Sequence, residues 1–148
     1  MLEFKKIEKE RNNEALDLVW QVFSIFEVPD FPPEGALEYK RIIDETRTLR
    51  NVEFYACLDN DKIVGVLGMR DNNHIGYFYV DPQYHKRGIG KTLFNLMKGD
   101  YEKKEFTVNA APYGVPVYRR LGFVETDTIQ NLRGVIFTPM KYKEMQND

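Results

Sequence analysis

A glycine-containing turn flanked by basic residues is the part of this chain whose residue types and spacing could do chemistry. The aromatic stretch Tyr77–Val80 leads through a turn at Pro82 to Gly88-Ile89-Gly90, after which apolar residues recur with helical periodicity. Glycine has no Cβ and lets the backbone approach a ligand closely, and a helix N-terminus adds unpaired N–H groups and the positive end of its dipole. The cationic residues around this turn are Lys86, Arg87 and Lys91. The segment therefore predicts a binding site for phosphate groups.

Two common phosphate motifs do not fit this turn. A dinucleotide-binding loop needs a third glycine where the chain has Leu93, and a nucleoside-triphosphate loop needs a glycine where it has Lys86. A lone Gly-x-Gly is a weak signal, because a purely structural strand-to-helix turn also uses glycines. A nucleotide-phosphate site and a structural turn are both open from this segment alone.

A second segment narrows these alternatives. Residues 106–123 predict a strand from Phe106 to Asn109, then a short helix with Pro116 in its first turn, which ends at Gly122. The two segments contain Val80-Asp81-Pro82, Arg87-Gly88-Ile89-Gly90-Lys91 and Tyr118-x-x-x-Gly122-Phe123. In this order the motifs resemble the GNAT superfamily of acetyl-CoA-dependent N-acetyltransferases. The stretch Ala111-Pro112-Tyr113-Gly114-Val115-Pro116-Val117-Tyr118 also resembles a subgroup common among its small bacterial single-domain members.

The resemblance implies where acetyl-CoA, the expected co-substrate, binds. In the family, the strand before the glycine loop pairs its backbone with the pantetheine arm, and the matching residues here are Phe78, Tyr79 and Val80. The family's pyrophosphate loop corresponds to His85, Lys86, Arg87, Gly88, Ile89, Gly90 and Lys91, with His85 where the family has Gln or Arg. Asn109 is the expected hydrogen-bond partner of the pantetheine, and Ala111 stands where the family often has a second Asn.

Tyr118 is the expected general acid. A free tyrosine titrates near ~10 and a thiol near ~8.5, so the phenol stays protonated at neutral pH and can give a proton or hydrogen bond to the departing thiolate. The family often has a tyrosine with this role at the same place. The alternative interpretation is a tyrosine that only packs beside Leu121 in a short helix.

The sequence assigns no general base. The position at which many family members carry a glutamate falls on Gly76, and His74, two residues away, is interpreted as a surface histidine. The proline-interrupted region between the first two helices, which lines the acceptor side in family members, carries Glu27, Asp30 and Glu34. These acidic residues either attract a cationic amine or are solvated loop charges, and the second interpretation is favoured.

Cysteine and histidine usage predicts neither a covalent intermediate nor a metal site. Cys57 lies in an alternating strand with no basic neighbour to lower its pKa, which indicates an inert core thiol. Two histidines and one cysteine without ligand spacing predict no metal centre.

Composition describes an ordinary globular chain. Its 148 residues fit a single domain over 1–148, with 43% hydrophobic and 30% charged residues. A net charge of −2 gives no reason to expect nucleic-acid binding. A single cysteine, with no leader segment or long apolar run, favours a cytoplasmic protein that does not bind membranes.

Hydrophobic periodicity and turn residues predict one α/β (α+β) domain. Helices are expected near residues 13–26, 34–48, 90–98 and 115–121, and strands near 2–7, 52–58, 63–69, 74–80, 106–109, 123–128 and 133–142. The strand at 52–58 is predicted to be half-buried because its apolar residues alternate. The GNAT resemblance implies the same order, with a mixed, mostly antiparallel sheet of six to seven strands and about four helices.

The leading hypothesis is an N-acetyltransferase that moves an acetyl group from acetyl-CoA to an amine by direct transfer in a ternary complex. The acceptor is a small-molecule or protein amine that the sequence does not identify, and a homodimer is left open. The alternative is a noncatalytic acyl-CoA-binding sensor or interaction module on the same fold.

Overall fold

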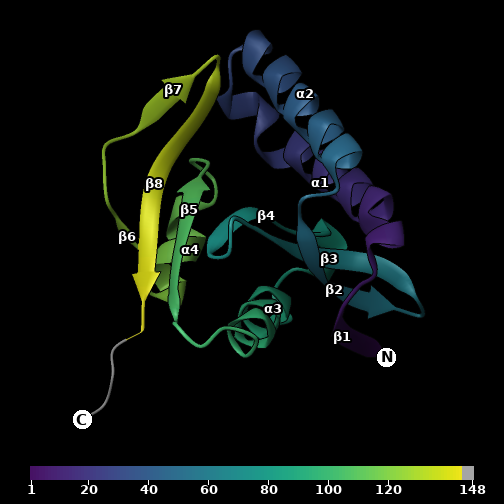
Figure 1. Cartoon of the computed structure of the whole chain (residues 1–148). Coiled ribbons are helices and arrows are strands. Elements are labelled where there is room, and N and C mark those ends of the chain that lie inside the picture. Colours follow the sequence, from purple (N-terminus) through teal and green to yellow (C-terminus); the bar gives the residue numbers. More distant parts are fainter. Residues whose placement is uncertain (145–148) are drawn as a thin grey trace.

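The structure, a computed structural model that describes residues 1–144, contains four α-helices and eight β-strands (Figure 1). The helices are α1 (Asn12–Phe26), α2 (Pro33–Leu49), α3 (Ile89–Lys98) and α4 (Val115–Leu121). The strands are β1 (Leu2–Lys6), β2 (Glu53–Asp59), β3 (Lys62–Arg70), β4 (His74–Val80), β5 (Glu105–Ala110), β6 (Val124–Glu125), β7 (Gln130–Leu132) and β8 (Val135–Lys143). The predicted fold class is confirmed. One strand more than expected is present because the chain after Gly122 forms three strands in place of two. None of the helices in the described part is long and apolar enough to span a bilayer.

The sheet is divided at its centre. Its strand order is β1-β2-β3-β4-β5-β8-β6, with β7 paired to β8, and only β4 and β5 run parallel. This parallel pair is in register only at His74 with Thr107 and Ile75 with Val108. Beyond Ile75, within residues 1–144, β4 has no strand opposite it on the β5 side. The two strands diverge, and the sheet opens into two arms (Figure 1).

Helices cover both faces of the sheet. Tyr55 and Cys57 of β2 lie in a hydrophobic core with α3 and α4, while Phe54 and Ala56 lie in a second core with α1 and α2. The prediction of a half-buried β2 was therefore wrong, because residues Phe54–Leu58 are buried on both faces. Residues 54–58 form the continuous apolar run that is typical of a strand covered by helices on both faces. The prediction considered only every second residue of this run and therefore assigned one face to solvent.

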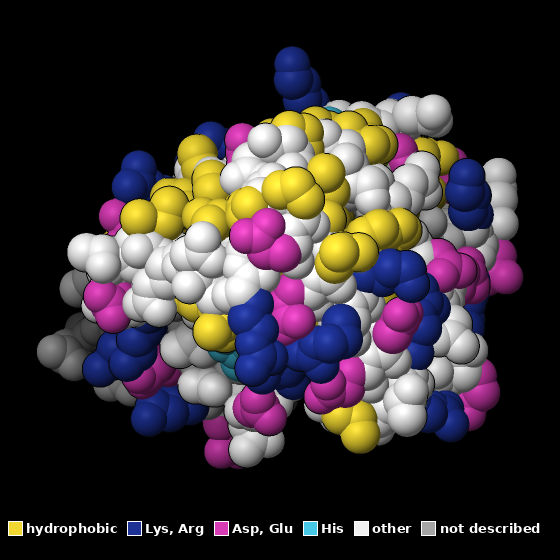
Figure 2. All heavy atoms as spheres, turned by 90° about the horizontal axis from the view of Figure 1, so that it is seen from above, with side chains coloured by type: hydrophobic (Ala, Val, Ile, Leu, Met, Phe, Trp, Pro, Cys, Tyr) yellow, Lys and Arg dark blue, Asp and Glu magenta, His cyan; other side chains and the backbone are white. Residues whose placement is uncertain are grey.

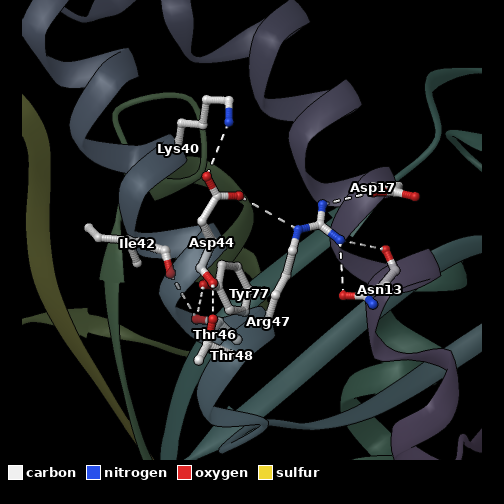
Figure 3. A network of polar contacts seen from close by, with 9 residues as sticks. All are labelled: Asn13, Asp17, Lys40, Ile42, Asp44, Thr46, Arg47, Thr48 and Tyr77. Atoms are coloured by element: carbon white, nitrogen blue, oxygen red, sulfur yellow. Dashed lines mark hydrogen bonds and ion pairs between the residues drawn. The ribbon is translucent and has the colours of Figure 1, made fainter.

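Polar contacts fix α2 against α1 and the sheet (Figure 3). The Arg47 guanidinium donates to Asp17 at 2.7 Å and to Asn13 at 3.2 Å on α1. The Thr46 hydroxyl donates to the Ile42 carbonyl at 3.0 Å and lies 2.7 Å from the hydroxyl of Tyr77 on β4. These bonds hold α2 as a fixed wall facing β4.

A close glycine pair joins the start of α2 to the tip of the β7–β8 hairpin. Gly134 has φ +88, and a Cβ there would lie 2.5 Å from the Gly35 backbone nitrogen. A Cβ on Gly35 would in turn collide with the Gly134 carbonyl. Only glycine at both positions allows this contact, which brings the hairpin over the open end of the sheet.

Candidate functional site

The divergence of β4 and β5 creates a large cavity. Its volume is about 910 Å³, and its lining comes from α1, α2, β4, the glycine turn, β5, α4 and the β7–β8 hairpin. Hydrophobic and aromatic side chains dominate this lining. Such a cavity is large enough for an extended ligand that enters between the two arms of the sheet.

The register of β4 leaves an unpaired backbone edge in this cavity. The Asp81 N–H donates to the Val64 carbonyl at 2.8 Å, which makes these two residues a hydrogen-bonded antiparallel pair. Bonded and non-bonded pairs alternate, so Val80 opposite Gly65 and Phe78 opposite Leu67 direct their N–H and C=O groups away from β3. Those groups face the gap left by β5. The Val80 carbonyl lies 2.9 Å from His85 Nε2, and the Val80 N–H and both backbone groups of Phe78 are open to an extended ligand that pairs as an added strand.

Tyr79 is placed differently from its two neighbours. It lies opposite Val66, so its backbone belongs to the β3–β4 ladder. Its side chain points to the α1/α2 face, where its hydroxyl donates to the Glu27 carboxylate at 2.9 Å and lies 2.8 Å from the Tyr39 hydroxyl. Of the three strand residues expected to meet a ligand through the backbone, Phe78 and Val80 have the geometry for it, whereas Tyr79 reaches the site through its side chain.

The glycine turn has the conformation of an anion site. Gly88 precedes α3 with φ +73, and a Cβ there would meet nothing within 4 Å. Gly90 lies in the first helical turn, where a Cβ would contact the Phe78 ring at 3.5 Å. The first N–H groups of α3 have no partner within the helix and point toward this turn. Gly88, Ile89, Gly90 and Lys91 all border the cavity.

The basic side chains of the turn are exposed and held in different ways. Lys86 has φ +65, which helps the chain reverse before α3, and it borders the cavity. The Arg87 guanidinium lies over the Tyr84 ring at 4.9 Å. The His85 Nε2 lies 2.9 Å from the Val80 carbonyl, so its imidazole holds the end of β4 against the turn.

Tyr118 of α4 lies beneath the gap between the arms. It is 8% exposed, with its ring packed edge-on against Phe78 and Phe123. Its hydroxyl has no hydrogen-bond partner within residues 1–144, and the residue lines the cavity. Burial, with a smaller contribution from the charge of Glu27, raises the pKa of Tyr118 well above its ordinary value. The phenol is thus a neutral donor available to a ligand.

Glu27 is the acidic residue that the cavity buries. It is 8% exposed at the C-terminal end of α1, and the prediction that it is a solvated loop charge was wrong. Burial raises the pKa of its carboxyl to about 7, against the lowering effect of the Tyr79 hydrogen bond. The negative end of the α1 dipole acts in the same direction as burial. A carboxylate that titrates near neutral pH beside Tyr118 is suited to general-base work.

The sequence contained a signal for Glu27. Buried residues of α1 recur every four positions at Ala15, Val19 and Phe23, and the next member of this row is Glu27. By contrast, Asp30 and Glu34 are exposed, as predicted.

The remaining sequence candidates occupy clear positions. His74 is half-buried, not on the surface; its Nδ1 lies 2.8 Å from the Thr107 hydroxyl, and burial lowers its pKa to about 4. Asn109 is exposed on β5 and borders the cavity. Cys57 is fully buried, which confirms its predicted place in the core, and burial raises the pKa of its thiol. Within residues 1–144, no three His, Cys, Asp or Glu residues are grouped as metal ligands.

Sequence comparison assigns this arrangement to a family. The sequence model of the acetyltransferase (GNAT) domain matches residues 27–144, which is most of the chain. The chain belongs to the GNAT acetyltransferase family.

Relatives and solved structures agree with this assignment. The GNAT chain is 32% identical over 109 residues to the uncharacterized N-acetyltransferase YafP of Escherichia coli K12, covering 68% of this chain and 69% of YafP. A GCN5-related N-acetyltransferase from Rhodopseudomonas palustris superposes with a TM-score of 0.77 at 18% identity, over 96% of this chain and 95% of the other. The PaiA N-acetyltransferase from Thermoplasma acidophilum, solved with coenzyme A, gives 0.69 at 17% identity, over 97% and 99%. At these identities the two structures show the shared fold.

The GNAT site has the features that a CoA thioester requires. The open backbone edge at Phe78 and Val80 suits the amide-bearing pantetheine arm, and Gly88 at φ +73 leaves its surroundings free for a phosphate. The N-terminus of α3, with Lys86 and Lys91 nearby, supplies N–H groups and positive charge for the pyrophosphate. The residues present therefore fit this group.

A branched side chain at Gly90 is expected to block the phosphate site. In Gly90→Val, the Cβ would make only ordinary contact with Phe78, so the fold is retained while the γ-methyls cover the helix N-terminus. We expect acetyl-CoA affinity to fall at least about tenfold in calorimetry, the scale of one lost hydrogen bond to a charged group. Asn95→Val places the same side chain at an exposed position of α3, outside the cavity lining, and serves as the control. Unchanged affinity in Gly90→Val would contradict the phosphate assignment.

Arg87→Ala tests the exposed cation above Tyr84. We expect a loss of CoA affinity of roughly two- to fivefold, in the range of exposed ion pairs, which diminishes as salt concentration rises. If Arg87 contacts the 3′-phosphate, the substitution should weaken the binding of CoA more than the binding of dephospho-CoA, which lacks that phosphate. Equal losses for both ligands would contradict this contact. Lys103→Ala removes an exposed charge paired with Glu105 outside the cavity lining and is the matched control.

Proposed function

We propose that this GNAT domain transfers an acetyl group from acetyl-CoA to an amine directly, in a ternary complex. The observation that carries the proposal is a single cavity that joins the anion-binding turn, the unpaired β4 edge, Tyr118 and Glu27. The turn and strand edge would hold the CoA thioester, which supplies an activated acetyl group. The α1/α2 side of the cavity is left for the acceptor amine.

Glu27 is the proposed general base. An alkylammonium ion near neutral pH must lose a proton before its nitrogen can attack, and the Glu27 carboxylate accepts that proton above its pKa of about 7. Tyr79 positions the carboxylate through its hydroxyl, and Tyr39 in turn holds Tyr79. Because burial also raises the pKa of both phenols well above the ordinary value, they stay neutral donors while Glu27 changes its charge.

Tyr118 is the proposed donor to the leaving sulfur. The deprotonated amine nitrogen forms a bond to the acetyl carbon, the carbon–sulfur bond breaks, and the sulfur leaves as a thiolate. The nitrogen loses a second proton as the amide forms, and the thiolate takes up one proton. Because the raised pKa of the phenol opposes its own ionisation, Tyr118 acts by donating a hydrogen bond to the developing thiolate. The backbone N–H of Val80, which faces the gap, is the proposed donor that polarises the acetyl carbonyl.

Ligand-dependent stability and turnover test the proposal together. A ligand that binds only the native state raises the melting temperature, so acetyl-CoA should stabilise the protein while ATP and NAD should not. Thiol release that requires an added amine then identifies a transferase. Stabilisation by acetyl-CoA without acetylation of any amine, including lysine peptides, would instead support the noncatalytic acyl-CoA-binding module. No stabilisation by acetyl-CoA would contradict both.

A further inference from the structure

The acceptor side of the cavity has an apolar, aromatic wall. Phe31, Tyr39 and Ile42 line it from the start and middle of the α2 region, and Phe137 lines it from β8. Ile42 and Phe137 are half-buried and lie outside both hydrophobic cores of residues 1–144, so their apolar surface borders the cavity and not the protein interior. Hydrophobic side chains also gather over part of the face that is seen from above in Figure 2. A ligand group that fills this space must itself be apolar.

The charges on the same wall are mainly acidic. Its carboxylates are Glu27, Glu38 and Glu45, and its one guanidinium is that of Arg41. Arg41 is already bonded to Glu38 at 2.8 Å and to Glu45 at 2.9 Å, so it has little capacity for a substrate carboxylate. Glu27 has no cationic partner within residues 1–144, and an ammonium ion can supply the missing positive charge.

The other positive groups in or near the cavity form no ion pair with Glu27 within residues 1–144. Lys86 and Lys91 belong to the glycine turn, and Arg120 belongs to α4. Arg70, at the end of β3, is paired with Asp71 at 2.7 Å, and the low pKa of His74 keeps it neutral. Arg133, at the hairpin tip, approaches Glu38 at 3.8 Å. An anionic group next to the reacting amine would therefore meet Glu27 without a free cation beside it.

We infer that the acceptor is a primary amine carried by an apolar, ring-sized body with no carboxylate beside the amine. This inference rests on the proposed function and names its substrate class. The ammonium group is attracted to the Glu27 carboxylate, while the body fills the space beside Ile42 and Phe137. Amino acids are rejected because their carboxylate would be buried near Glu27 without a partner.

Binding of four probes to the CoA-saturated protein tests this inference independently of turnover. The probes are 2-phenylethylamine, phenylalanine (which adds a carboxylate), ethanolamine (which lacks the ring) and spermidine (a polar polycation). Calorimetry should give 2-phenylethylamine a Kd at least about tenfold below that of each other probe, the scale expected for burying a ring. The same order is expected in kcat/KM for acetylation.

A cavity variant assigns the preference to the apolar wall. Phe137→Ser should bring the affinity ratio of 2-phenylethylamine to ethanolamine toward one, whereas Ile129→Ser changes an exposed residue outside the cavity and should preserve the ratio. Equal binding of 2-phenylethylamine and ethanolamine, or tighter binding of phenylalanine or spermidine, would overturn the inference while acetyl-CoA turnover still supports the proposed function. Should acetyl-CoA itself fail to bind, the proposed function and the inference fall together.

Discussion

Glu27→Gln is expected to lower turnover by about 10²- to 10⁴-fold, the usual contribution of a positioned general base. Glutamine keeps the size of the side chain and an oxygen that accepts the Tyr79 hydroxyl, but it cannot take a proton from the acceptor amine. In the wild type, kcat/KM should fall with one protonation as pH drops below about 7, the pKa of the buried carboxyl. Steady-state rates from pH 5.5 to 9 measure both effects.

The same substitution is expected to stabilise the fold at alkaline pH. The folded pKa of Glu27 is about 7, above its ordinary value of 4.5, so the folded state holds the proton more tightly and wild-type stability declines as pH rises from about 4.5 to 7. Glutamine does not titrate, and at pH 8 its gain in the free energy of unfolding should approach about 3 kcal/mol, at 1.36 kcal/mol per pKa unit. The gain should vanish near pH 4.5 in urea unfolding.

An exposed carboxylate nearby provides a matched control. Glu34→Gln removes a charge from the same region but should change neither turnover nor the pH dependence of stability appreciably. Asp30→Asn should instead shift the pH dependence slightly to lower pH, because the charge of Asp30 contributes to the raised pKa of Glu27. If Glu27→Gln kept wild-type turnover at pH 8, the amine would be deprotonated by another group or by water. A loss of activity with no gain in stability would show that Glu27 is not the buried titrating group.

Tyr118→Phe is expected to reduce kcat on the order of 10²-fold while acetyl-CoA affinity stays near the wild-type value. The phenyl ring keeps its contacts with Phe78 and Phe123, and the lost hydroxyl has no partner within residues 1–144. Its contribution therefore arises only when charge develops on the sulfur, which is the signature of an interaction made in the transition state. Stopped-flow or steady-state assays with calorimetry separate kcat from binding.

Tyr113→Phe is the control for this experiment. Tyr113 also lines the cavity, where its ring stacks on Phe26 at 4.7 Å, and it is 46% exposed. Removal of its hydroxyl should leave kcat within about twofold, as for most exposed positions. Wild-type turnover in Tyr118→Phe would mean that the thiolate leaves without help and that Tyr118 is structural.

The sequence by itself determined the features that depend on local backbone conformation. Gly88 and Gly122 have positive φ and flank α3 and α4 as their spacing predicts, and the order of helices and strands follows from periodicity and turn residues. The motif order around them was specific enough to identify the family. Such features need no knowledge of distant segments, because a glycine turn or a helix start is set within a few residues.

The tertiary structure alone decided which carboxylate is buried in the cavity. Glu27, Asp30 and Glu34 look alike in a proline-rich loop, yet only Glu27 is buried, because Tyr79, 52 residues further along the chain, closes over it. The pKa of about 7 follows from that burial and not from any neighbour in sequence. Likewise, the loss of pairing between β4 and β5 after Ile75 turns two ordinary strands into the walls of a cavity. Desolvation and strand divergence are properties of packed surfaces, and they exist only once segments far apart in the chain have met.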